Sequence, residues 1–165
     1  MCAPGVRVRS GSADERVIAA GFRWPEGASV ELLNALSAGT LMETLGIVFT
    51  ELGDGYLRAT MPVEPRTHQP YGLLHGGASV VLGETLGSSA GGLMAGRDAA
   101  VVGLEINANH LRAVRSGIVT GTTRPIHIGR STQVWEYRIA DADDRAVCIG
   151  RITLAVLPKP PGSGA

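Results

Sequence analysis

The sequence predicts an α+β domain in which one long apolar helix packs against a mainly antiparallel sheet. The helix is expected to start at His75–Gly77 and to end near Gly91–Gly92, because apolar residues such as Ala78, Leu82 and Leu86 recur there at helical spacing. A β-hairpin precedes this helix, and four β-prone segments follow it. The connections between these segments are too short for crossover helices, so the strands are expected to pair antiparallel.

Length and charge exclude several classes of protein. The chain has 165 residues, which fits one domain with a sizeable core. Lys+Arg and Asp+Glu both number 15, so net charge provides no attraction toward nucleic acid or an anionic membrane. No segment approaches the roughly 18 apolar residues of a membrane span, and we find no signal peptide. Cys2 and Cys148 form no disulfide or metal pattern, so we expect a cytoplasmic protein with reduced thiols.

The segments before the long helix carry recognisable boundaries. Residues 1–28 are rich in Gly, Ala, Arg and Ser, and we expect a flexible extension in which only Phe22 and Trp24 could pack on the domain. A short helix is expected after Ser29 as its N-cap, with Gly39 as its stop. A further helical turn is expected directly after this glycine.

The hairpin is predicted from runs 47–52 and 56–61, which Gly53–Gly55 joins. Asp-Gly between β-prone runs favours a tight turn. Pro62 and Pro65 are expected to end the second strand, because proline cannot donate to a central ladder.

Four later strands complete the domain. They are expected over residues 99–113, 118–128, 132–140 and 146–157. Pro125 inside the second of them should mark an edge or a bulge. The folded domain is therefore expected over 29–157, followed by a disordered tail over 158–165.

Glu84 is the only charged residue between His75 and Ala95. A lone carboxylate on an apolar helix is costly to bury unless it is hydrogen-bonded, so Glu84 is a candidate catalytic group. Ser88 follows four residues later and lies on the same helix face. The alternative is that Glu84 points to solvent from a surface helix, but such a helix would carry more charges.

Three glycines, Gly83, Gly87 and Gly91, recur at four-residue intervals along the same helix. Each costs a helix roughly 1 kcal/mol relative to alanine, which makes sense if another backbone packs closely along this ridge. One sheet of this size cannot cover a helix that is apolar on most faces. We therefore expect the equivalent helix of a second subunit to lie along the glycines.

Gly76 and Gly77 bring unpaired backbone N–H groups to the helix start, where the helix dipole is positive. Such a place suits a developing oxyanion, although glycines needed only for the turn remain the alternative. Taken singly, the polar residues nearby are ambiguous. Without any function, Gln69 would be an ordinary loop residue, His75 would be a structural helix cap, and His110 would be a strand-end residue.

The segment from Ile106 to Trp135 contains no acid but contains four arginines. This one-sided charge favours a phosphate-bearing ligand, for which Gly129, Arg130 and Ser131 offer turn amides, a guanidinium and a hydroxyl. Solvated arginines on alternate strand faces remain an equally good interpretation.

Three stretches in combination resemble the hotdog-fold acyl-CoA thioesterases: HQPYGLLHGGASVVLGETLGSSAG, VVGLEINANHLR and RPIHIGRSTQVW. The resemblance covers about Val30 to Leu157 and is strongest to the branch of 1,4-dihydroxy-2-naphthoyl-CoA and enterobactin-proofreading thioesterases. It implies a curled antiparallel sheet around one long helix, dimers that pair into tetramers, and no metal. It also implies no cofactor apart from the CoA of the substrate.

The resemblance implies a role for each polar residue around the helix. Glu84 would attack the thioester carbonyl or activate water, and the Gly76 amide would polarise that carbonyl. Gln69 and His75 would support the amide, and Ser88 would help to hold water. His110 would lie near the acyl ring of the substrate. The CoA phosphates would be contacted by Gly129, Arg130 and Ser131.

We therefore expect hydrolysis of an acyl-CoA, with an aromatic acyl group favoured. The alternatives are the same chemistry on a carrier-protein thioester and a non-catalytic acyl-CoA-binding module. A hydratase would need a His/Asp pair facing the acyl chain, which the sequence does not suggest. Gly76 and Glu84 are eight residues apart, or about 12 Å along one helix. One carbonyl cannot span that distance, so each site should use two chains.

Overall fold

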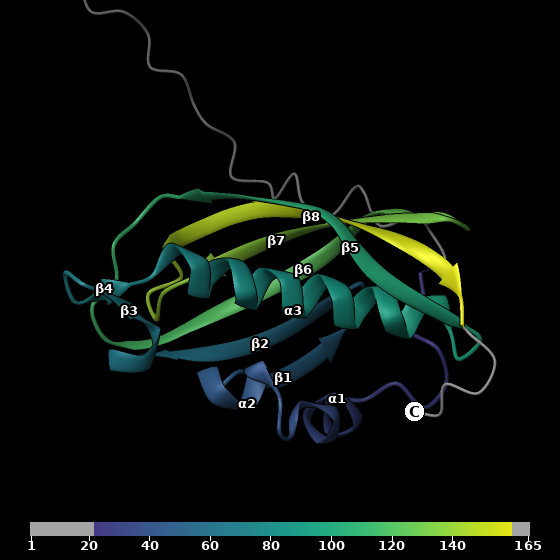
Figure 1. Ribbon diagram of the computed structural model, residues 1–165, viewed down its shortest axis with the longest axis horizontal. Helices are drawn as coiled ribbons and strands as arrows, with labels where there is room; N and C mark the ends of the chain where they lie inside the picture. Colours follow the sequence, from purple (N-terminus) through teal and green to yellow (C-terminus); the bar gives the residue numbers. More distant parts are fainter. Residues whose placement is uncertain (1–21, 160–165) are drawn as a thin grey trace, which may run out of the picture.

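The computed structural model of the protein describes residues 22–159. A six-stranded sheet in the order β1-β2-β6-β7-β8-β5 curls around the long helix α3 (Gly76–Ala95) (Figure 1). The strands are β1 (Val48–Gly53), β2 (Tyr56–Val63), β5 (Ala99–His110), β6 (Gly117–Ile128), β7 (Thr132–Ala140) and β8 (Ala146–Pro158). All five strand pairings are antiparallel, which confirms the expected fold class.

Short elements lie at the two ends of the sheet. Helices α1 (Val30–Ser37) and α2 (Leu41–Leu45) precede β1. A 3-10 turn (Pro65–Thr67) leads into a two-stranded hairpin, β3 (His68–Gln69) and β4 (Leu73–Leu74), just before α3. The predicted caps are confirmed: the Ser29 side chain accepts from the Leu32 N–H at 3.2 Å, and Gly39 follows α1 with a left-handed φ of 71°.

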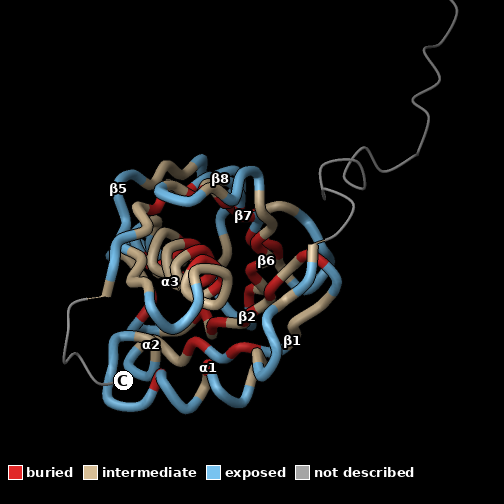
Figure 2. The backbone as a smooth tube through the Cα atoms, turned by 90° about the vertical axis from the view of Figure 1, so that its right-hand side faces the viewer, coloured by how far each residue is buried: buried red, intermediate tan, exposed pale blue. Residues whose placement is uncertain are grey.

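The core lies between α3 and the concave face of the sheet. Figure 2 shows α3 end-on inside the curl, with α1 and α2 closing the open side below it. Along β2 and β7, buried side chains alternate with half-buried or exposed ones, as a one-sided sheet requires. The aromatic side chains of this core are Trp135 and Tyr137 on β7 and Phe49 on β1.

The glycine ridge of α3 faces this sheet, so the prediction that a second helix packs along it is wrong. A Cβ on Gly83 would lie 2.7 Å from the Tyr137 ring, and one on Gly87 would lie 2.3 Å from Ile152. The ridge exists because bulky side chains of β7 and β8 need room against the helix backbone. Sequence spacing revealed the close approach but not which neighbour made it.

This packing predicts opposite effects for two glycine substitutions. Gly83→Ala should lower the free energy of unfolding by about 1–3 kcal/mol, the usual effect of overpacking, because the Tyr137 hydroxyl is tied to the Asn107 carbonyl at 2.7 Å. Gly92→Ala should raise it by about 1 kcal/mol through helix propensity, because its Cβ would meet only Val101, at 3.7 Å. Urea denaturation measures both values, and equal stabilisation by the two alanines would contradict the packing described.

The structure corrects two strand boundaries and confirms one irregularity. Strand β5 ends at His110 and not at residue 113. Strand β2 continues through Pro62 to Val63, so Pro62 does not end it. Strand β1 pairs with β2 only as far as Thr60, so no strand lies beside Pro62 on that edge. The Pro62 carbonyl instead accepts a hydrogen bond from the Thr67 hydroxyl at 2.9 Å. The proline therefore needs no N–H on that open side. Pro125 does mark a bulge, because the β6–β7 register shifts next to it.

The described chain begins against the core. Trp24 stacks on Trp135 with ring centroids 6.2 Å apart and donates its indole N–H to the Gly53 carbonyl at 2.7 Å. Phe22 meets Trp24 edge-on, so the packing expected of these two aromatic residues is confirmed. The C-terminal tail was expected from residue 158, but Pro158 is the last residue of β8, and Lys159 donates to the Asp98 carbonyl at 3.0 Å. The flexibility expected for residues 1–21 and 160–165 lies outside the described residues.

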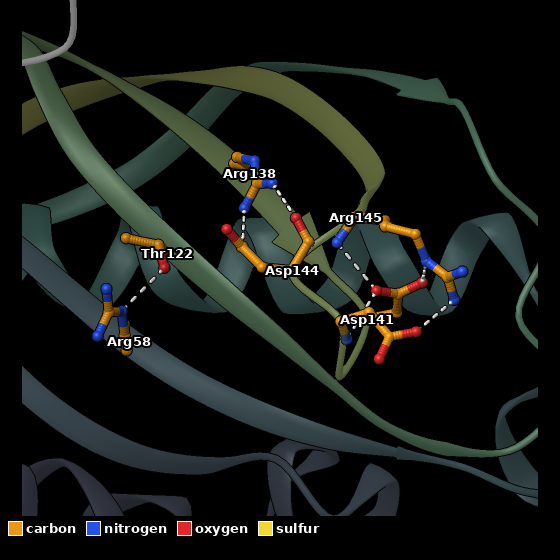
Figure 3. Close-up of polar contacts among 7 residues, drawn as sticks. Arg58, Thr122, Arg138, Asp141, Asp144 and Arg145 are labelled. Carbon is orange, nitrogen blue, oxygen red and sulfur yellow. Dashed lines mark hydrogen bonds and ion pairs between the residues drawn. The ribbon is translucent and has the colours of Figure 1, made fainter. Parts of the chain in front are cut away.

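The convex face of the sheet carries several hydrogen bonds and ion pairs. Figure 3 shows Arg58 bonded to Thr122 across β2 and β6, and Arg138 bonded to Asp144 at 2.7 Å. In the β7–β8 turn, Arg145 pairs with Asp141 at 2.8 Å. The same side of the sheet also exposes the apolar Ile126 and Ile149. Within residues 22–159, no helix is both long and apolar enough to cross a membrane.

Candidate active site

The start of α3 presents one backbone donor without a protein partner. His75 is the N-cap residue, and its Nδ1 accepts the Gly77 N–H at 2.8 Å. The N–H groups of Ala78 and Ser79 both donate to the His75 carbonyl. Among the described residues, the Gly76 N–H donates to no protein acceptor, and it lies at the positive end of the helix dipole. This amide can bind a carbonyl oxygen that gains negative charge.

The cap bond also sets the tautomer of His75. Because Nδ1 accepts a hydrogen bond, the ring proton of the neutral imidazole belongs on Nε2. The ring is exposed, so this Nε2–H can donate to a ligand beside the Gly76 amide. The cap role considered for His75 is therefore confirmed, and it leaves the second ring nitrogen free for a ligand.

Gly76 lies against His110, which ends β5. A Cβ on Gly76 would be only 2.7 Å from the His110 Nε2, so only glycine allows this contact. Next to this pair is a pocket of about 350 Å³, whose polar lining comes from Gln69, Ser79 and Arg112. The structure thus brings three sequence-predicted residues, Gln69, Gly76 and His110, to one pocket at the start of α3.

The hairpin that carries Gln69 is held by backbone bonds. Leu74 donates to the Val114 carbonyl at 2.8 Å, and His75 donates to the Thr67 carbonyl at 2.8 Å. The Gln69 side-chain oxygen accepts the Tyr71 N–H within the turn, which leaves its amide nitrogen available to donate. Backbone hydrogen bonds therefore brace the loop that carries Gln69.

Glu84 lies two turns further along α3 and is half-buried. The Ser88 hydroxyl donates to its Oε1 at 3.3 Å, as the i, i+4 spacing predicted. The same oxygen lies over the backbone of β5, where a Cβ on Gly103 would be 2.8 Å from it. One hydrogen bond leaves most of the acceptor capacity of this carboxylate free for water or substrate.

Tyr137 forms the floor beneath this part of the helix. Burial raises the pKa of its hydroxyl, and the nearby Cys148 and Glu84 raise it further. The hydroxyl therefore remains a hydrogen-bond donor, to the Asn107 carbonyl of β5. This bond ties β7 to β5 under the segment of α3 that carries Glu84.

A second pocket begins one helical turn beyond Glu84. It has a volume of about 520 Å³ and is lined by Ser88, Ser89 and the C-terminal half of α3 on one side. On the other side lie α1, α2 and residues 25–28. Its side chains are mainly apolar: Leu32, Leu33, Leu36, Met42, Leu93 and Val101. The pocket can take an apolar group attached to a carbonyl at Glu84.

Comparison with known proteins identifies the fold family. The profile of the Thioesterase superfamily matches residues 71–148. The proofreading thioesterase EntH of Cronobacter sakazakii is 54% identical over 134 residues, which are 81% of this chain and 98% of the relative. The 1,4-dihydroxy-2-naphthoyl-CoA hydrolase of Escherichia coli is 50% identical over 134 residues, with the same two shares. The chain belongs to the thioesterase superfamily.

A solved structure of the same family agrees with the fold. The thioesterase HI1161 of Haemophilus influenzae superposes with a TM-score of 0.81 and 45% identity, covering 86% of this chain and 99% of that one. The expected hotdog fold and hydrolysis of thioesters are therefore confirmed for this chain. In the described part of this thioesterase, no three His, Cys, Asp or Glu side chains gather in a group that could hold a metal ion.

Within one chain, the thioesterase does not bring all predicted residues together. Gly76 and Glu84 lie on one helix, about 12 Å apart along its axis. Gly129, Arg130 and Ser131 form the β6–β7 turn, where the Ser131 carbonyl accepts from Val156. Val156 pairs with Val101, which is nine residues of strand, or roughly 30 Å, from His110. The predicted phosphate contacts therefore lie far from the Gly76 pocket of the same chain.

Sequence reasoning missed three features of this site. Gly103 gives Glu84 room, and its signal was a glycine inside a strand that turns out to contain a bulge. Arg112 lines the Gly76 pocket, and it stands two residues after His110 in the acid-free segment. The leucines of α1 line the second pocket, and nothing local in the sequence indicated that α1 lies against α3.

Proposed function

We propose that this thioesterase hydrolyses an aromatic acyl-CoA, with Glu84 as the reacting carboxylate and the Gly76 amide as the oxyanion donor. The observation that carries the proposal is the pairing of a free N–H at the start of α3 with a lightly bonded carboxylate on the same helix. Acyl transfer needs both groups, one for the charge on oxygen and one for attack on carbon.

The reaction has two balanced routes. As a nucleophile, Glu84 forms a C–O bond to the thioester carbon while the C–S bond breaks, and CoA leaves as a thiolate that takes up a proton. Water then hydrolyses the resulting anhydride and restores the carboxylate. As a general base, Glu84 instead takes a proton from water while the water oxygen attacks the same carbon. The C–S bond then breaks, and the departing CoA thiolate takes up the proton held by Glu84, which restores the carboxylate. In both routes the carbonyl oxygen is held by the Gly76 N–H, with His75 and Gln69 as further donors.

We infer that two copies of the chain build each site. The amide of one copy must meet the carboxylate of the other, because one carbonyl cannot span about 12 Å. Strand β5 is the sheet edge beside α3 and exposes Leu104, which is 63% accessible. Antiparallel pairing of two such edges would extend the sheet and place the two α3 helices antiparallel across a two-fold axis. The face of α3 used there is that of Glu84, since the glycines face the sheet. Pairing of such dimers into tetramers stays a prediction.

The acyl group is proposed from the second pocket. Its volume of about 520 Å³ and its leucine-rich lining suit an aromatic group attached to the carbonyl. Two relatives are named for 1,4-dihydroxy-2-naphthoyl-CoA hydrolysis and for proofreading, at 50% and 54% identity. A carrier-protein thioester is therefore the second candidate substrate. We also place the enzyme in the cytoplasm, the reducing compartment expected from its cysteine usage.

A hydrolysis panel tests the proposed function. Release of free thiol is followed with benzoyl-, 2-naphthoyl-, acetyl- and palmitoyl-CoA, and with an aromatic acyl group on a carrier protein. The proposal expects the highest kcat/KM for the aromatic CoA esters. A preference for the carrier-bound ester would favour proofreading, and binding without turnover of any ester would favour a non-catalytic acyl-CoA module.

Arg130→Ala tests the proposed phosphate contact. The substitution should raise KM for CoA esters while kcat at saturation changes little, because a nucleotide contact stabilises ground state and transition state alike. The same acyl group on a pantetheine arm, which lacks the nucleotide phosphates, should show no such rise. Arg115→Ala, in the same acid-free segment but outside the proposed site, is the matched control. Equal losses with both esters would make Arg130 a structural residue.

A further inference from the structure

One polar side chain bonds helix α1 to the edge of the sheet. Asn34 donates its amide to the Phe49 carbonyl at 2.9 Å and accepts the Phe49 N–H, also at 2.9 Å. It thereby takes the place of a neighbouring strand at the free edge of β1, which is the last strand of the sheet. A helix of eight residues is marginal in isolation, so its location depends on this pair of bonds and on the buried Leu33.

The opposite side of α1 carries apolar side chains that the described residues leave largely uncovered. Leu36 is 60% accessible and Leu32 is 44% accessible, and both line the pocket beyond Glu84. Leucines held against an open cavity gain free energy when a ligand covers them, roughly 25 cal/mol for each Å² of apolar area removed from water. The wall is therefore built to be completed by an apolar ligand.

The pocket is linked to the carboxylate of Glu84 through Ser88. Ser88 both lines the pocket and donates to Glu84 at 3.3 Å, so a group entering from the carbonyl reaches α1 after passing Ser88. Resting on the proposed function, we infer that α1 is the wall that sets the size of the acyl group. Leu36 is the specificity-determining residue at its far side, and Asn34 is the positioning residue that holds the wall.

The test compares kcat/KM for 2-naphthoyl-CoA and benzoyl-CoA, which differ by one ring. Leu36→Trp should lower the naphthoyl-to-benzoyl ratio by about tenfold, the low end of what one extra methylene costs in an apolar pocket. Leu41→Trp is the matched control, because Leu41 is 55% accessible on α2 but does not line the pocket. Its ratio should equal that of the wild type.

The positioning role of Asn34 has its own readout. Asn34→Leu removes both bonds to Phe49 and should lower the same ratio through a higher KM for the naphthoyl ester. Asn34→Asp keeps the acceptor for the Phe49 N–H and should give an intermediate ratio. Ile139→Val, in the core of β7 away from the pocket, provides the comparison for a loss of stability alone, and its ratio should not move.

The outcomes separate this inference from the proposed function. If wild-type enzyme hydrolyses both esters but Leu36→Trp scales them by the same factor, α1 does not set acyl size, although the hydrolysis proposal stands. If wild-type enzyme hydrolyses neither ester, the proposed function fails first. Because Leu36 is exposed, its variant is expected to fold even if Asn34→Leu does not.

Discussion

Glu84→Gln is expected to reduce kcat by at least about 100-fold, the usual contribution of a positioned base or nucleophile. The substitution keeps the shape of the side chain and its bond from Ser88, but an amide neither attacks a thioester nor takes a proton from water. KM should change little, because the loss falls on the chemical step. Steady-state hydrolysis of an aromatic CoA ester measures both constants.

The matched control is Glu136→Gln. This acid lies on the exposed convex side of β7, away from α3, so its removal should leave kcat and KM unchanged. Near-normal turnover in Glu84→Gln would remove Glu84 from the chemistry and would revive the non-catalytic binding module as the best interpretation.

Mixing two inactive variants is expected to restore activity. One partner carries Glu84→Ala and the other carries Gln69→Ala with His75→Ala. If each site takes its carboxylate from one chain and its amide donors from the other, a hybrid dimer holds one intact site and one with every defect. Random pairing after joint unfolding and refolding should then yield about a quarter of wild-type activity.

Different affinity tags on the two variants allow hybrid dimers to be isolated and counted. Each variant refolded alone is the control, and it should remain inactive because none of its sites is complete. Isolated hybrids without activity would show that each site is built within a single chain, and would also contradict the antiparallel arrangement of the α3 helices.

The sequence predicted the hydrogen bonds, caps and bulges that depend only on residues close together along the chain. The Ser88–Glu84 bond follows from i, i+4 spacing, and the cap at Ser29 follows from residue type. The bulge at Pro125 follows from a missing N–H. The prediction that β2 ends at Pro62 was wrong. A strand can contain proline where no neighbouring strand needs its N–H, and the sequence near Pro62 does not show where β1 stops.

The glycine ridge shows the same limit at longer range. Repeated glycines on α3 showed that something approaches the helix closely, but a partner helix and large side chains of the sheet require the same spacing. Only the tertiary structure shows Tyr137 and Ile152 in that space. It also moves the proposed subunit contact to the face of α3 that carries Glu84.

By itself, the sequence determined the fold class, the long helix, and the residues Glu84, Ser88, Gln69, His75, Gly76 and His110 as the candidates for chemistry. The helix follows from periodicity, and Glu84 with Ser88 follows from a lone acid and i, i+4 spacing. Gln69, His75 and His110 were ambiguous singly and received their expected roles from the resemblance to hotdog thioesterases. The tertiary structure alone decided that His110 meets Gly76, that Gly103 makes room for Glu84, and that α1 walls the pocket beyond Ser88. Each of these contacts joins segments whose approach is set by how the sheet curls around α3, and that geometry depends on packing across the whole domain.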